Sequence, residues 1–227
     1  MVLVAVGAFG VVDVASRRHP RASSAALRRP APVPAPVVSS VPPTTQVYQA
    51  RPGPNGTKLL TEPVDPLTLA VPTSWTAAAA DEITLPDDIT RFAQQAAPLA
   101  ALLQAQKLTA VKGGVRLFAY QPTAPQAFVM VVSSYSPGAA PLTASGVSAM
   151  VSATKKTPNV AVTGATLPVG QVLKVDQTSV AQKQRVAVEA IYVGSPDRLI
   201  VVEMAAVADT AGPPALFAQI AQTISLS

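Results

Sequence analysis

The sequence contains no cysteine and a single histidine, His19, among 227 residues. Without cysteine, the chain has no disulfide, thiolate nucleophile, iron–sulfur cluster or cysteine-ligated zinc site. Because His19 lies in the N-terminal tail, the rest of the chain lacks the histidine that a Ser-His-Asp triad, an HExxH zinc site or a two-histidine iron site requires. We therefore expect a protein that is not an enzyme, with no catalytic residues, no cofactor and no metal site.

Charged residues are also scarce, at 13% of the chain, and they are unevenly distributed. Residues 1–60 carry seven Lys and Arg residues and one acidic residue, for a net charge of +6. Residues 61–227 carry ten Lys and Arg residues and eleven acidic residues, for a net charge of −1. Eleven of the 23 prolines lie in residues 1–66. Such a stretch favours extended polyproline II and buries little, so we expect residues 16–65 to be a basic linker, disordered or in polyproline II.

Residues 1–15 are almost continuously apolar, with Asp13 as their one charged residue. As a helix they span roughly 22 Å, less than the ~30 Å hydrocarbon core of a bilayer. No basic residue precedes them, as one does in a signal peptide. We favour a truncated membrane anchor or signal whose true start lies upstream of Met1. The alternative is a buried strand or a marginal amphiphile with no membrane role.

Hydrophobic patterns predict a folded domain over residues 66–227. Alternating and continuous apolar runs predict strands, and spacings of three and four residues predict helices. The expected strands lie near 67–71, 115–120, 127–135, 159–166, 169–176, 185–193 and 198–207, and the expected helices near 89–103, 141–155 and 213–224. The last two strands are apolar throughout and therefore central. Strands with two apolar faces need cover on both sides, which predicts an α+β fold with an antiparallel β-sheet sandwiched by helices (α/β/α).

Element order and short motifs resemble a known group. The motifs are Val71-Pro-x-x-Trp75, Leu117-Phe-Ala119, Leu167-Pro-x-Gly170 and a hairpin from Tyr192 to Asp197-Arg198. The domain resembles the actinobacterial α/β/α-sandwich domains of the LpqN type, which are related to the PsbP-like superfamily and to the Ran-binding nucleotide-release factors. This resemblance implies a binding module, and it carries over no functional residue, because the group offers no shared catalytic motif to map.

A few residues nevertheless have the chemistry of a site. Four carboxylates gather in one short segment and are able in principle to bind a hard cation or act as an acid/base pair, although helix capping explains them better. Lys155 and Lys156 are placed to complement a helix dipole, and Trp75 to anchor the core. Asn55-Gly-Thr57 matches a glycosylation sequon. The four carboxylates are Asp81, Glu82, Asp87 and Asp88.

These observations favour a non-enzymatic binding domain of the cell envelope, tethered to the membrane through residues 1–15 or exported, in a bacterium. Its partner is expected to be a protein or an envelope component. Nucleic acid is not expected, because the basic tail interleaves its cations with prolines rather than with aromatic residues. Two alternatives remain open at this point: a hydrolase or transferase that uses only carboxylates, and a protein-binding module of the cytoplasm.

Overall fold

The computed structural model describes residues 49–62, 67–79, 99, 115–121, 123, 126–154, 157–181, 183–207 and 214–226. The chain divides into two units, Met1–Thr44 and Thr45–Ser227. Every described residue belongs to the second unit, so the fold is that of this unit alone.

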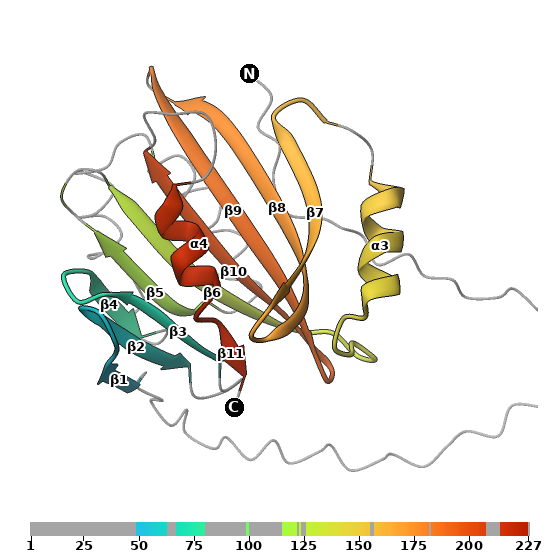
Figure 1. Cartoon of the computed structure of the whole chain (residues 1–227), viewed down its shortest axis with the longest axis horizontal. Coiled ribbons are helices and arrows are strands. Elements are labelled where there is room, and N and C mark those ends of the chain that lie inside the picture. Colours follow the sequence, from blue (N-terminus) through green and yellow to red (C-terminus); the bar gives the residue numbers. More distant parts are fainter. Residues whose placement is uncertain are drawn as a thin grey trace, which may run out of the picture. The chain divides into compact units, whose positions relative to one another are not determined.

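Seven antiparallel strands form the larger sheet, in the order β4-β5-β6-β10-β9-β8-β7 (Figure 1). A smaller antiparallel sheet has the order β1-β2-β3-β11. The larger sheet consists of β4 (Thr76–Ala79), β5 (Val115–Gln121), β6 (Ala127–Tyr135), β7 (Val160–Leu167), β8 (Gly170–Ala181), β9 (Gln184–Ser195) and β10 (Arg198–Val207). The smaller consists of β1 (Gln49–Pro52), β2 (Thr57–Glu62), β3 (Leu67–Pro72) and β11 (Ser225–Leu226). The described part of the chain also has the helices α3 (Ala144–Ala153) and α4 (Ala215–Ala221).

The pairing of β9 with β10 lies at the middle of the larger sheet, as the continuous apolar runs predicted. The two strands are joined by a tight turn at Pro196-Asp197, in which Asp197 has φ of 55°. Asp197 fixes this turn to the segment after β6, because its Oδ1 accepts a hydrogen bond from the N–H of Gly138 at 2.8 Å. Gly194 lies under the same segment: a Cβ there would be 2.2 Å from the carbonyl oxygen of Ala140. Only glycine fits at that point of the strand.

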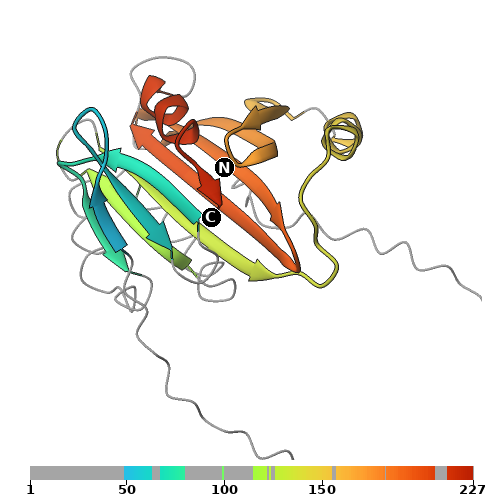
Figure 2. The same ribbon diagram turned by 60° about the horizontal axis from the view of Figure 1, so that its bottom comes forward.

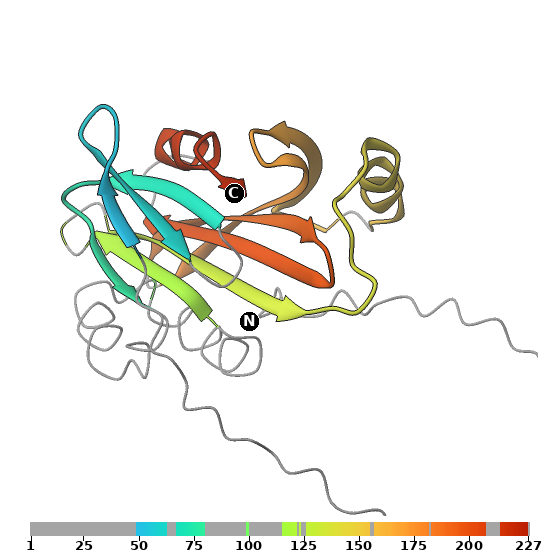
Figure 3. The same cartoon turned by 90° about the horizontal axis from the view of Figure 1, so that it is seen from below.

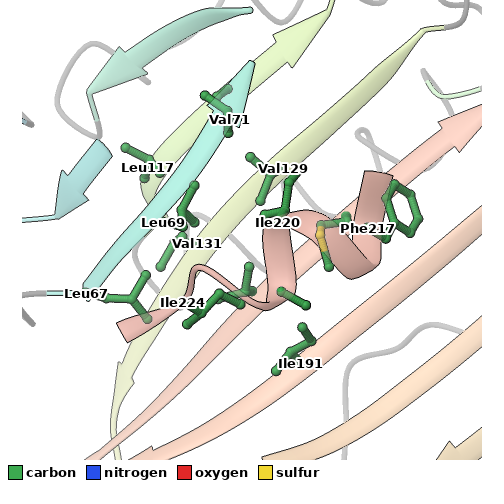
Figure 4. Close-up of a cluster of buried hydrophobic side chains, with 14 of the residues drawn as sticks. Leu67, Leu69, Val71, Leu117, Val129, Val131, Ile191, Phe217, Ile220 and Ile224 are labelled. Atoms are coloured by element: carbon green, nitrogen blue, oxygen red, sulfur yellow. The ribbon is translucent and has the colours of Figure 1, made fainter. Parts of the chain in front are cut away.

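One face of the larger sheet is covered by the smaller sheet together with α4. The buried side chains of this cluster come from β2, β3, β5, β6, β9, β10 and the C-terminal segment (Figure 4). Phe217 and Ile220 are the buried residues at the centre of α4, and Ile224 follows just after the helix. Figures 2 and 3 show α4 lying over this side of the larger sheet. The opposite face carries a second buried cluster of Leu99, Phe118, Tyr120, Phe128, Met130, Val186, Val188 and Ala205.

The predicted α/β/α sandwich is wrong. The structure is mostly β, with two antiparallel sheets and, in its described part, two short helices that form no flanking layers. The error arose because periodicity shows that a face is covered but not what covers it. Here the cover includes a second sheet, whereas α3 lies beside β7 at one end of the larger sheet (Figure 1).

The predicted linker also extends too far along the chain. Residues 49–62, assigned to it, form the hairpin of β1 and β2. Its turn carries Asn55 and Gly56 at φ of 53° and 71°, and the N–H of Thr57 donates to the carbonyl of Pro54 at 3.1 Å. Asn-Gly at two positive φ angles is a common hairpin turn, and its prolines and glycines were mistaken for linker composition.

Most individual elements of residues 115–226 were predicted correctly, since the structure has β5 to β10, α3 and α4 close to the expected positions. Met150 is an exception. Its spacing of three residues from Val147 predicts that it lies on the inner side of the helix, but it is 47% exposed, and Val147 is the buried residue of α3. Of the helix predicted near 89–103, only Leu99 lies in the described residues, where it is helical and buried.

Ile220 of α4 packs into the buried cluster between the larger sheet and its cover of α4 and the smaller sheet, which we call the main core. Shortening this side chain should destabilise the fold. Ile220→Ala is expected to lower the free energy of unfolding by about 3 kcal/mol, through lost apolar contact and the cavity left behind. The control is Gln219→Ala, a change at the exposed neighbour on the same helix, with an expected effect below about 0.5 kcal/mol. Urea unfolding followed by circular dichroism measures both, and equal effects would contradict the packing described.

Candidate functional site

Three charged side chains meet on the inner face of β8 and β9. Asp176 on β8 lies directly opposite Glu189 on β9, and Lys174 is two residues from Asp176, on the same face of its strand. The register places these residues beside Val172 and Ile191, which belong to the main core. We call Lys174, Asp176 and Glu189 the polar trio.

Glu189 is held in place by one ion pair and is closed to solvent. Its Oε2 lies 3.1 Å from Nζ of Lys174, and the residue is only 2% exposed. Its other oxygen, Oε1, is buried and has no hydrogen-bond partner among the described residues, and the same is true of Oδ1 of Asp176. Two acceptors are therefore left unpaired on two residues that face each other across the strands.

This crowding affects the pKa of Glu189. Burial raises the pKa of Glu189 above its ordinary value of 4.5, the charge and hydrogen bond of Lys174 lower it, and the charge and hydrogen bond of Asp176 raise it, with a net rise. Two carboxylates side by side repel each other, whereas one proton held between them gives each buried oxygen a partner. Glu189 therefore binds its proton more tightly than a free glutamic acid does.

Two more ionisable side chains, Tyr192 and Glu203, lie near each other on the opposite face of the larger sheet. Residues 190, 192 and 203 belong to that face, because they alternate with the core residues Ile191, Val202 and Met204. Burial and the charge of Glu203 raise the pKa of Tyr192 to about 12. Glu203 itself is buried.

The polar trio was not predicted from the sequence, although a signal for it exists. Glu189 interrupts the apolar run Val186–Val193, and a carboxylate within a strand covered on both faces needs a partner. Lys174 and Asp176 alternate on the preceding strand, which places them on one face. What the sequence lacks is the register that brings Asp176 opposite Glu189.

Trp75 is confirmed as a core anchor. It is buried, its Nε1 donates a hydrogen bond to Oε1 of Gln121 at 3.0 Å, and its carbonyl accepts one from Nζ of Lys58. Its indole therefore satisfies its one donor inside the protein and leaves no free face as a ligand platform.

The other residues singled out in the sequence lie outside the described residues. They are His19, Asp81, Glu82, Asp87, Asp88, Lys155 and Lys156. Within the described residues, no group of three or more acidic or histidine side chains is arranged to hold a metal ion. Neither α3 nor α4, the helices of that part of the chain, is long and apolar enough to cross a bilayer.

The chain matches no protein-family model and no curated protein.

The raised pKa of Glu189 predicts how stability depends on pH. The folded-state pKa of Glu189 lies above its value in the unfolded chain, so the folded protein binds this proton more tightly. Its contribution to stability is complete below pH 4.5 and is lost as the pH rises through the folded pKa. In Glu189→Gln the amide donates permanently to Asp176. We expect the free energy of unfolding at pH 7 to rise by about 1 kcal/mol, and the loss of stability above pH 4.5 to shrink.

Urea unfolding at intervals between pH 4 and pH 8 tests this prediction. Asp176→Asn supplies the same permanent donor from the other strand and should behave similarly. Arg185→Gln, a change at an exposed residue of β9, should keep the wild-type dependence. An unchanged pH profile for Glu189→Gln and Asp176→Asn would contradict the raised pKa of Glu189.

The half-buried phenol of Tyr192 gives a separate spectroscopic prediction. Because the folded-state pKa of Tyr192 is about 12 against 10.0 for a free phenol, its stabilising contribution is complete below pH 10 and is lost as the pH approaches 12. The ultraviolet absorbance titration of the wild-type protein minus that of Tyr192→Phe should show one tyrosine ionising near pH 12. A difference curve with its midpoint near pH 10 would mean that the Tyr192 phenol is not buried beside a charge.

Proposed function

We propose that the folded unit is a non-enzymatic binding domain of the bacterial cell envelope, held at the membrane by residues 1–15. The observation that carries the proposal is the burial of Glu189, the central carboxylate of the polar trio. This carboxylate is 2% exposed and is held by the ion pair with Lys174. A general acid must come within hydrogen-bond reach of its substrate, and Glu189 is sealed from any.

The order of the chain supports the location. An apolar segment is followed by a basic, proline-rich stretch, and then by the folded unit that begins at Thr45. Residues 16–44 in polyproline II would reach at most about 90 Å, so the domain would stand away from the bilayer. The five arginines of residues 1–44 would favour anionic lipid by about 1 kcal/mol for each cation near the surface.

The expected partner is a protein or an envelope component. The chain beyond residue 60 has a net charge of −1, so long-range attraction to a polyanion such as nucleic acid is not expected of it. The resemblance to PsbP-like domains stays a prediction that agrees with a binding role, although the α/β/α layering that it implied is not the one observed.

Cell fractionation tests the location. The full chain is expected in the membrane fraction, resistant to high salt and released by detergent, because its attachment is apolar rather than electrostatic. A variant that lacks residues 1–15 should be soluble. The Val6→Arg/Val11→Arg double variant keeps the length of the segment while breaking its apolar run, and it should behave like the deletion.

Recovery of the full chain in the soluble fraction would contradict the anchor and would favour a protein-binding module of the cytoplasm. Release of the full chain by salt alone would assign its attachment to the basic tail rather than to residues 1–15.

A further inference from the structure

The edge of the larger sheet at β7 is built for pairing. β7 pairs with β8 over its whole length, from Val160 opposite Gln177 to Leu167 opposite Gly170. It is the last strand of the sheet, and within the described residues no strand pairs with its other edge. An eight-residue edge strand of this kind presents a row of unused backbone donors and acceptors.

The residues that carry those groups can be assigned from one hydrogen bond. The carbonyl of Asn159 accepts from the N–H of Thr178 at 3.1 Å, so it points toward β8. Backbone groups alternate along a strand, so those of Val162, Gly164 and Thr166 point away from β8. The carbonyl of Val160 also points away, whereas its N–H is already bonded to the carbonyl of Thr157.

This edge lacks the usual protection against pairing. Natural edge strands carry lysine, proline or a bulge that discourages another strand. β7 has the sequence Val-Ala-Val-Thr-Gly-Ala-Thr-Leu, with no charge, no proline and an unbroken register to β8. Thr163, Gly164 and Thr166 are exposed.

The neighbouring helix covers a face of β7 rather than its edge. A Cβ added to Gly164 would be only 2.5 Å from Cγ1 of Val147 in α3. The helix therefore lies on the face of β7 to which a side chain at residue 164 would point. α3 also contacts β8, which places it over both strands. Like β7, α3 has no charged residue, and it exposes Met150.

We propose that β7 pairs antiparallel with β7 of a second copy of this chain, about a two-fold axis, to join two larger sheets into one. A two-fold axis sets each surface against itself, so a charged strand would meet its own charge, and a neutral strand does not. The occupant is a second copy because both β7 and the adjacent α3 are uncharged along their whole length. The backbone groups that point away from β8 in one copy must meet the same groups in the other copy. The two registers that overlap most of the strand have their two-fold axis at Thr163 or at Gly164, and each register forms about six hydrogen bonds between the two copies.

Sedimentation velocity of the full chain in mild detergent tests the pairing, and the wild-type protein is expected to form a dimer. Val162→Pro removes an N–H that points outward without removing a bond to β8, and such a proline is tolerated at an edge. It should weaken dimerisation by at least about tenfold. Val162→Thr keeps the N–H and a similar shape, and should dimerise as the wild type does. Val180→Lys replaces the most exposed valine, on β8 beyond the paired segment, and should also dimerise normally.

A cross-linking experiment covers the case in which Val162→Pro fails to fold. The chain has no cysteine, so Thr163→Cys/Ala165→Cys introduces the only thiols. Residue 163 faces 163 or 165 of the second copy in the two registers, so a disulfide-linked dimer should form on oxidation in either. A wild-type protein that stays monomeric at all concentrations would overturn the proposal, even if its β7 edge binds a peptide strand from another molecule. So would a folded Val162→Pro variant that dimerises normally, or the absence of the cross-link.

Discussion

The pairing of β9 with β10 is the interaction on which the rest of this structure depends. Both strands are apolar on both faces, and their register runs without a break from Arg198 opposite Ser195 to Val207 opposite Val186. A sheet with such a centre must be covered on two sides, and the two hydrophobic clusters lie on its two faces. The Pro196-Asp197 turn fixes where the pairing begins. The side chains on both faces of the central strands are consequently buried in the fold. In the described sheet, the unpaired backbone groups lie along its edge strands.

Acidic residues in such a sheet are constrained by the same burial. Glu189 and Glu203 lie on neighbouring central strands, on opposite faces, and neither reaches solvent. A buried carboxylate must be paired or must hold a proton. Lys174 pairs with one oxygen of Glu189, and burial beside Asp176 raises the pKa of the Glu189 carboxyl. The site is therefore a consequence of the fold, with an effect on stability rather than an open reaction centre.

The sequence predicts the local elements better than their assembly. The apolar runs of β6, β9 and β10 and the spacing in α4 are direct signals, because each element must bury its own side chains. The smaller sheet was missed since β1 and β2 are short and their turn has the composition of a linker. The Asp176–Glu189 pair was missed for a different reason: it depends on register between strands, which is set by the hairpin connections and not by either strand alone.

The faces of the central strands are buried by folding, and an unpaired edge of the described sheet lies along β7, where we propose that a second copy pairs. The most direct measurement is residue-resolved hydrogen exchange on the full chain at low and high protein concentration. The account predicts that the amides of Val162, Gly164 and Thr166 exchange quickly in dilute solution and become protected as the concentration rises. Those of Ala161, Thr163 and Ala165, which point toward β8, should be protected throughout. Equal protection of both sets at every concentration would contradict the account.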